Sequence, residues 1–235
     1  MASPRALLVI PENNTTMAPE LAALCPQLAP FDVARVKRPA RTLLREDLPA
    51  YADATLAAVE PFLAARPDLV FYGCTAAGFL AGSDGNAAMV QKLAVRTGAR
   101  VVSTAGAMAD VLRHGGVAWA AVVTPYLAPV NDGLRAYLAA SGIEVETLES
   151  FLCATTAELG RITADEVRDL ALRTVTPRSA ALFIACSQLP TLAILDDLRT
   201  RLRIPVWSSI AAPAWAAMIV STSRSWSVNT SACVA

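Results

Sequence analysis

Two cysteines in equivalent surroundings are the residues of this sequence best suited to chemistry. Cys74 and Cys186 are 112 positions apart, each ends a short apolar run, and each precedes a hydroxyl residue, Thr75 or Ser187. If both cysteines follow strands and precede helices, backbone N–H groups and the helix dipole favour the thiolate form. One thiolate can then attack carbon or accept a proton while the other thiol supplies a proton. This chemistry needs neither a metal nor a histidine.

Groups that can bind an anion surround the same positions. Asn14 follows the first apolar run, and a shift of 112 positions places Tyr126 on it. These two side chains, the hydroxyls of Thr75 and Ser187, and neighbouring N–H groups could hold a carboxylate or an enolate oxygen. The alternative interpretation is structural: the thiols are small apolar residues at strand ends, Asn14 caps a turn, and Tyr126 packs in the core. The recurrence of the cysteine–hydroxyl pair favours the catalytic interpretation.

The other residues that could bear chemistry are interpreted as structural. Five cysteines without a CxxC motif, and a single histidine, match no metal-site spacing. Cys25 and Cys153 are predicted to be structural, Cys233 is incidental, and His114 ends a helix. No dinucleotide-binding or phosphate-binding glycine motif is present, and the two lysines lie away from the strand ends. We therefore predict no metal and no cofactor.

The composition argues against several classes of protein. The 235 residues include 20 basic and 20 acidic side chains, so the net charge is zero and nucleic acid is not an expected partner. Apolar residues make up 54% and charged residues 17%, which excludes a disordered chain. The mean hydropathy of +0.44 reflects 47 alanines, and no apolar run reaches the roughly 18 residues of a membrane span. The apolar stretch 6–10 is too short for a signal peptide, so we expect a cytoplasmic protein.

One basic cluster interrupts this balanced distribution of charge. Its members are Arg35, Lys37, Arg38, Arg41 and Arg45. Two acidic residues follow it directly, so it is predicted to be a solvated loop. The less favoured interpretation places one of these arginines against an anionic substrate.

Short apolar runs alternate with longer amphipathic segments along the chain. Strands are predicted at 6–10, 32–36, 69–72, 101–103, 118–123, 144–148, 181–184 and 206–208. Helices are predicted at 51–65, 87–97, 105–114, 130–141, 164–175 and 191–202. The shift of 112 positions superimposes the first three strands on the fifth, sixth and seventh, which indicates an internal repeat.

The predicted fold is therefore α/β. It has two pseudo-symmetric Rossmann-like halves, each a short parallel sheet flanked by helices, with the active site in the cleft between them. The N-terminal half spans 1–110 with Asn14 and Cys74, and the C-terminal half spans 111–220 with Tyr126 and Cys186. Residues 221–235 form a tail with no clear periodicity.

At these residues the sequence resembles the aspartate/glutamate racemase superfamily, and within it the branch of maleate cis–trans isomerases and arylmalonate decarboxylases. The similarity covers about residues 5–220. The matching stretches are 11–17 (PENNTTM), 73–76 (GCTA), 123–126 (VTPY) with Asn131, 186–191 (CSQLPT) and 205–209 (PVWSS). Arylmalonate decarboxylases keep only the second cysteine, so the presence of both Cys74 and Cys186 favours an isomerase or a racemase.

The resemblance implies a role for each of these residues. In a maleate isomerase, the Cys74 thiolate would add to the double bond of maleate and form a succinyl-cysteine intermediate, whose single bond can rotate. Cys186 would donate and remove the proton at the adjacent carbon, Asn14 and Tyr126 would hold the carboxylates, and elimination would release fumarate. The expected substrate-binding residues are Asn14, Thr75, Ala76, Tyr126, Asn131, Thr156, Ser187 and Gln188. The expected partner is a small dicarboxylate, and the resemblance implies a homodimer.

One segment departs from the isomerase pattern. The isomerases carry a second asparagine in the loop after the sixth strand, whereas residues 153–158 read CATTAE. Either Thr155 or Thr156 replaces one hydrogen bond, or the substrate differs. Three other activities stay open: racemisation of aspartate, glutamate or a hydantoin, decarboxylation of an arylmalonate, and simple binding of a dicarboxylate without turnover.

Overall fold

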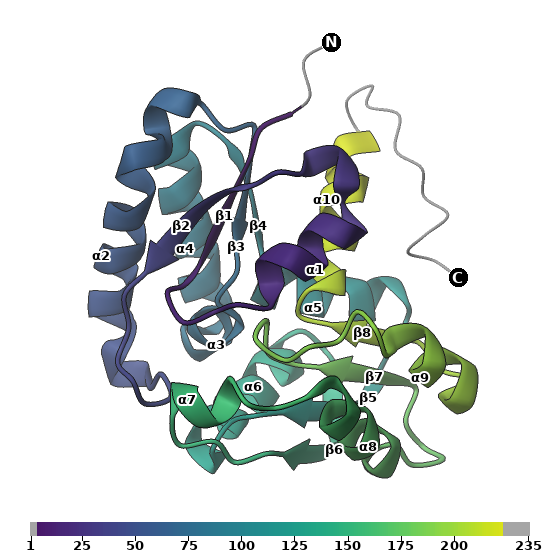
Figure 1. The fold of residues 1–235 in the computed structure, drawn as a ribbon. Coiled ribbons are helices and arrows are strands. Elements are labelled where there is room, and N and C mark those ends of the chain that lie inside the picture. The colour runs from purple at the N-terminus through teal and green to yellow at the C-terminus, as the bar shows by residue number, and fades with distance from the viewer. Residues whose placement is uncertain (1–3, 223–235) are drawn as a thin grey trace.

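Eight strands form two four-stranded parallel sheets in the computed structural model, which describes residues 4–222 (Figure 1). The first sheet has the order β2-β1-β3-β4, with β1 at Ala6–Pro11, β2 at Asp32–Val36, β3 at Leu69–Tyr72 and β4 at Arg100–Ser103. The second has the order β6-β5-β7-β8, with β5 at Trp119–Thr124, β6 at Glu144–Ser150, β7 at Ala181–Ile184 and β8 at Val206–Ser208. The predicted α/β fold with two similar parallel sheets is confirmed.

The two sheets repeat one plan with local differences. Leu7 pairs with Asp32, and the pair 112 positions later, Trp119 with Glu144, has the same register. The pairing of β1 with β3 and that of β5 with β7 differ in register by two residues. Strands β1, β3 and β7 are buried along their whole length, because helices cover both faces of each sheet.

The helices of the first half are α1 (Met17–Leu24), α2 (Leu48–Val59), α3 (Thr75–Leu80), α4 (Gly82–Thr97) and α5 (Thr104–His114). Those that follow are α6 (Ala128–Ala140), α7 (Thr156–Leu159), α8 (Ala164–Thr174), α9 (Leu195–Leu202) and α10 (Ala211–Thr222). Short 3₁₀ turns lie at Pro26–Leu28, Arg45–Asp47 and Glu60–Ala65. Helices α1, α7 and α10 were not predicted from the sequence, and α3 was expected only as a helix that starts after Cys74, without bounds. Most of the predicted tail lies outside the described residues.

Two apolar clusters fill the interior. The smaller lies between the first sheet and helices α2 and α4, where Val9 and Tyr72 meet Leu93. The larger joins both halves, since it contains Phe71 of the first sheet and Phe183 of the second. In Figure 1, α10 returns to the first half and lies beside α1, and α10 also contacts α5. The two sheets are therefore held together by a common core, which fixes the loops at their edges relative to one another.

None of the helices within residues 4–222 is both long enough and apolar enough to cross a bilayer.

Candidate active site

A small cavity of about 30 Å³ lies where loops from both halves meet. It is lined by Pro11, Asn13, Asn14, Arg38, Thr42, Cys74, Thr75, Ala76, Pro125, Tyr126, Cys153, Thr155, Thr156, Leu159, Cys186, Ser187 and Gln188. Four of the loops follow β1, β3, β5 and β7, which are the adjacent central strands of the two sheets. The chain leaves such neighbouring strands in opposite directions, and this opens a crevice at their carboxyl ends.

The structure brings nine of the ten predicted site residues to this cavity. The exception is Asn131 on α6, which lies behind the wall. Its Oδ1 accepts a hydrogen bond from Thr124 Oγ1 at 2.7 Å, and its Nδ2 donates to the backbone oxygen of Tyr126 at 2.9 Å. Asn131 therefore holds the loop that carries Tyr126 and does not face the cavity.

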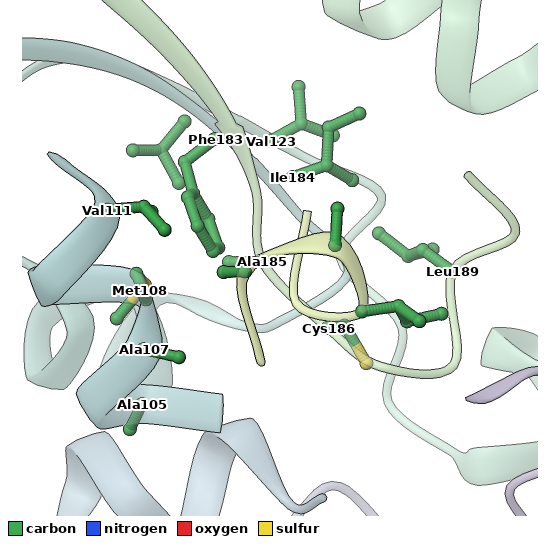
Figure 2. Close-up of a cluster of buried hydrophobic side chains, with 14 of the residues drawn as sticks. Ala105, Ala107, Met108, Val111, Val123, Phe183, Ile184, Ala185, Cys186 and Leu189 are labelled. Atoms are coloured by element: carbon green, nitrogen blue, oxygen red, sulfur yellow. The ribbon is translucent and has the colours of Figure 1, made fainter. Parts of the chain in front are cut away.

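The two cysteines occupy different local structures. Cys74 is the N-cap residue of α3, as the prediction of a following helix requires. The prediction is wrong for Cys186, because residues 186–194 form turns and α9 begins only at Leu195. Figure 2 shows Cys186 just beyond β7, at the edge of the apolar cluster around Phe183. A helix dipole is therefore not available to the Cys186 thiol.

Hydrogen bonds and burial control the protonation of Cys186 instead. Burial raises the pKa of the Cys186 thiol, and hydrogen bonds from the Tyr126 hydroxyl and the Gln188 N–H partly oppose this rise. The Cys74 thiol also raises this pKa, whereas the charge of Arg38 lowers it. Burial and the neighbouring Cys186 raise the pKa of Tyr126 well above 10. At neutral pH both Cys186 and Tyr126 therefore carry their protons.

A chain of hydrogen bonds links the two halves at the floor of the cavity. Asn14 Nδ2 donates to Ser187 Oγ at 3.0 Å, and Ser187 Oγ donates to the backbone oxygen of Gly73 at 2.7 Å. Asn14 Oδ1 accepts from the N–H groups of Thr16 and Met17 at the start of α1. The Asn14 side chain is thus fixed in place, and one of its amide hydrogens remains available for a ligand.

Two further contacts stiffen the same wall. The Gln188 side chain accepts from the Thr15 N–H at 2.9 Å and donates to Thr15 Oγ1 at 3.2 Å. The ring of Tyr126 packs edge-on against Phe79 of α3, with 5.6 Å between ring centroids. Thr75 Oγ1 is buried without a hydrogen-bond partner among the described residues, so this hydroxyl is available to a bound oxygen.

The rim of the cavity was not foreseen from the sequence. Residues 37–44, which we call the rim loop, contact the loop after β6 in the other half. The Thr42 N–H donates to the Ala154 oxygen at 3.1 Å, Thr42 Oγ1 donates to the Cys153 oxygen at 2.8 Å, and the Thr156 N–H donates to the Ala40 oxygen at 2.8 Å. An antiparallel bridge joins Arg41 and Thr155. These bonds close the cavity across the two halves.

One sequence-based interpretation changes as a result. Arg38 was assigned to a solvated loop, but its side chain lines the cavity because the rim loop folds over it. Cys153 was predicted to be structural, and it forms part of the wall. Burial, with smaller effects of Glu158 and Cys186, raises the pKa of Cys153 to about 11, so this thiol stays protonated at neutral pH.

The loop after β6 also contains the threonines considered as replacements for an asparagine. Both Thr155 and Thr156 line the cavity. Thr155 Oγ1 accepts from the Glu158 N–H at 3.2 Å, and the Glu158 carboxylate accepts from the Thr155 N–H, so Thr155 forms the capping box of α7. The Thr155 oxygen therefore accepts the cap hydrogen bond, and its hydroxyl hydrogen is not used by that cap. Within residues 4–222, no group of three or more His, Cys, Asp or Glu side chains is arranged to hold a metal ion.

Two similar α/β halves with one small cavity between them define the class of this protein. It is a two-lobed α/β protein with a cavity between its lobes. A family model described as arylmalonate decarboxylase matches residues 8–231. The chain belongs to the arylmalonate decarboxylase family, which confirms the resemblance to the isomerase and decarboxylase branch, and it is an enzyme of that family.

Maleate isomerases are among the similar proteins. The enzyme of Nocardia farcinica is 29% identical over 216 residues, covering 88% of this chain and 86% of the relative. The solved structure of the Nocardia farcinica maleate cis–trans isomerase bound to TRIS has a TM-score of 0.84 and 26% identity, and covers 92% of this chain and 91% of that chain. A variant of the same isomerase, with a cysteine replaced by serine, holds a covalently bound succinylcysteine intermediate; its TM-score is 0.82 at 26% identity, with 92% and 91% coverage.

Proposed function

We propose that this protein is a cofactor-independent cis–trans isomerase that converts maleate to fumarate through a covalent succinyl-cysteine intermediate. The observation that carries the proposal is the placement of two cysteines, one from each half, on one cavity between the halves. The similarity to maleate isomerases, one of which was captured with a succinylcysteine, supports the same chemistry.

The reaction needs a nucleophile and a proton donor on adjacent carbons. The Cys74 thiolate adds to one alkene carbon, and the π electrons move to the neighbouring carbon, which takes the proton of Cys186. The central bond is then single and rotates. The Cys186 thiolate removes that proton, the double bond re-forms, and the carbon–sulfur bond breaks to release fumarate and the Cys74 thiolate. No atom or electron is gained or lost over the cycle.

The electrostatics support this division of roles. Burial raises the pKa of Cys186, so this thiol starts the reaction protonated, as a proton donor must. The available amide hydrogen of Asn14 and the Thr75 hydroxyl are donors for the carboxylate and for the charge that develops during addition. The Tyr126 hydroxyl donates to Cys186 and stabilises the thiolate that forms there when the proton leaves. Hydrogen bonds hold the Asn14 side chain, and packing against Phe79 holds the Tyr126 ring, before a ligand binds.

Proton NMR of maleate with the purified protein tests the substrate. We expect the fumarate signal to appear with the native protein and to be lost with Cys74→Ser and with Cys186→Ser. Intact-protein mass spectrometry then separates the two roles: Cys186→Ser should accumulate an adduct with the mass of one maleic acid, and Cys74→Ser should not. Cys153→Ala removes a thiol of the same wall that the reaction does not use, and should retain turnover. Absence of fumarate at high native enzyme concentration would refute the proposal.

Decarboxylation of an arylmalonate is the second candidate, and the family match favours it. In that reaction Cys186 alone would protonate the carbanion left by loss of CO₂, so Cys74→Ser would stay active. Release of CO₂ from an arylmalonate, without conversion of maleate, would establish this alternative. Exchange of the α-hydrogen of aspartate or glutamate in D₂O would instead reveal a racemase.

The proposal also includes a cytoplasmic homodimer, as the family resemblance implies. Light scattering coupled to gel filtration measures the oligomeric state directly, and a monomeric mass would contradict that part.

A further inference from the structure

The charge of a dicarboxylate creates a specific demand on this cavity. A dianion taken from water into a closed site loses its hydration, and this cost is offset only by paired charges and hydrogen bonds. Among the described residues that line the cavity, Arg38 is the only Lys, Arg or His side chain, and Asp and Glu are absent from this lining. The cavity therefore has one cation with which to balance the ligand.

The bonding of Arg38 leaves part of its guanidinium unused. Its Nη2 donates to the Arg41 oxygen at 3.1 Å, whereas its Nε is buried and has no partner within residues 4–222. No salt bridge to Arg38 is found among those residues, in contrast to Arg41, which binds both oxygens of Asp47. A buried N–H of a charged group without an acceptor is costly, and a ligand oxygen would satisfy it.

The charge of Arg38 also acts on the reacting groups. Burial raises the pKa values of Cys186 and Tyr126, and the positive charge of Arg38 opposes both rises. The guanidinium therefore already favours negative charge at the place where the proposed chemistry occurs. Asn13 lines the same cavity, and its Nδ2 group is a second donor for a carboxylate.

We propose that Arg38 is a substrate-binding residue that pairs with one carboxylate of the dicarboxylate, and that it makes the site selective for a dianion over a monoanion. This inference rests on the proposed function, because it names the group that recognises the second carboxylate. Arg38 takes the place of the asparagine that the loop after β6 lacks, while Thr155 remains the cap of α7. Arg38 reaches the ligand because hydrogen bonds hold the rim loop against residues 153–156 of the other half.

Substrate selectivity separates this role from a structural one. The probes are maleate and its monoamide, maleamate, which has the same shape but one carboxylate. In Arg38→Gln we expect the ratio of kcat/KM for maleate over maleamate to fall about 10- to 100-fold, as for the loss of a charge-assisted hydrogen bond. Lys37→Gln removes the neighbouring exposed charge and should leave the ratio unchanged. An equal loss for both substrates in Arg38→Gln would overturn the proposal and indicate a structural role.

A binding measurement keeps this inference distinct from the proposed reaction. Succinate has two carboxylates and no double bond, so it binds without reacting. By calorimetry we expect the native protein and Lys37→Gln to bind succinate more tightly than succinamate, and Arg38→Gln to lose this preference. If maleate is not isomerised but the succinate preference depends on Arg38, the reaction fails and the subsite stands. If the native protein shows no preference for succinate, or Arg38→Gln retains it, the subsite is refuted.

Discussion

At the scale of single residues, the environment of Cys186 gives this thiol the role of proton donor and leaves the role of nucleophile to Cys74. This thiol is buried among apolar side chains and receives hydrogen bonds from Tyr126 and from the Gln188 N–H. Burial stabilises the protonated form of Cys186, and the hydrogen bonds from Tyr126 and Gln188 reduce the free-energy cost of forming its thiolate. A group that must give and then recover a proton in one cycle needs both influences.

Replacement of Tyr126 by phenylalanine tests this balance through the pH dependence of turnover. The Tyr126 hydrogen bond opposes the rise that burial imposes on the pKa of Cys186, so its removal raises this pKa further. Turnover declines at alkaline pH when Cys186 loses the proton that it must donate. We therefore expect Tyr126→Phe to lower kcat and to move the alkaline decline to higher pH, measured by initial rates across the pH range.

The control for this experiment is Tyr137→Phe. Tyr137 is a second buried tyrosine whose pKa is raised to about 12, by burial first, and it does not line the cavity. Its replacement should leave the alkaline decline where it is. An unchanged decline in Tyr126→Phe would mean that another group controls the alkaline side.

The sequence predicted the cavity residues that follow strands, and it missed Arg38, which lies on a long loop. Cys74, Cys186 and Tyr126 come directly after buried strands, so the sheet itself places them. The position of Arg38 depends on backbone bonds between the rim loop and residues 153–156, which are more than 100 positions away. Such pairing leaves no pattern in the local sequence, so charge alone suggested a solvated loop.

At the scale of elements, α3 is the support of the nucleophile. It begins immediately after Cys74, all six of its residues are buried, and it contacts α4, α5 and α6. The close approach to α5 depends on Gly78, because a Cβ there would lie 2.5 Å from the Cβ of Ala105. Two helix backbones cannot both remain in place if that position carries a side chain.

Gly78→Ala should therefore destabilise the fold and disturb the cavity together. We expect a loss of about 1–3 kcal/mol in the free energy of unfolding, typical of overpacking, with reduced turnover in the folded protein. Urea denaturation measures the first effect and initial rates the second.

Gly160→Ala serves as the matched control for this substitution. Gly160 has φ of −69°, and the nearest atom to an added Cβ lies at 3.4 Å. Its effect should stay within about 1 kcal/mol. Equal stability of the two variants would show that α3 and α5 separate without cost.

Helices α3 and α10 were given no bounds from the sequence for the same physical reason. Amphipathic helices such as α8 show a polar face, and the period of 3.6 residues reveals them. Helix α3 is buried on all sides, and Ala211–Ala217 in α10 are also largely buried, so neither has a polar face to mark the period. A short, uniformly apolar segment looks the same whether it becomes a strand, a helix or a turn.

At the scale of the whole molecule, polar contacts between the halves complement the shared apolar core. The Glu20 carboxylate on α1 accepts hydrogen bonds from the Thr191 N–H at 2.8 Å, Thr191 Oγ1 at 2.9 Å and the Leu192 N–H at 3.1 Å. Burial raises the pKa of Glu20, and these hydrogen bonds only partly compensate. The joint between the halves is therefore sensitive to pH.

Glu20→Gln tests this joint through stability. Because the folded pKa of Glu20 lies above the usual value of 4.5, the folded state binds this proton more tightly than the unfolded chain. Its contribution to stability is present in acid and is lost as the pH rises through the folded pKa. The free energy of unfolding of the native protein, minus that of Glu20→Gln, should therefore fall as the pH rises from about 4 toward neutrality.

Denaturant titrations at a series of pH values measure this difference. A matched control is Glu60→Gln, since Glu60 is exposed and lies within the first half. A difference that rises with pH would show that the hydrogen bonds, and not burial, dominate at Glu20.

The architecture was the most predictable level. The strand positions and the repeat of 112 residues appear in the sequence because buried parallel strands are continuous apolar runs, and both sheets have the same strand order. The two-residue difference in register between the β1–β3 and β5–β7 pairs could not be predicted, since fully buried strands have no polar residues to fix their alignment.

The repeated sheet order has one consequence for any molecule with two identical ends. Asn14 and Tyr126 stand at equivalent points of the two halves, yet one is an amide and the other a phenol. The two halves that form the cavity are similar, but the cavity itself has no two-fold symmetry. A ligand whose two ends are identical therefore contacts different groups at each end. The site distinguishes these two ends before any covalent bond forms.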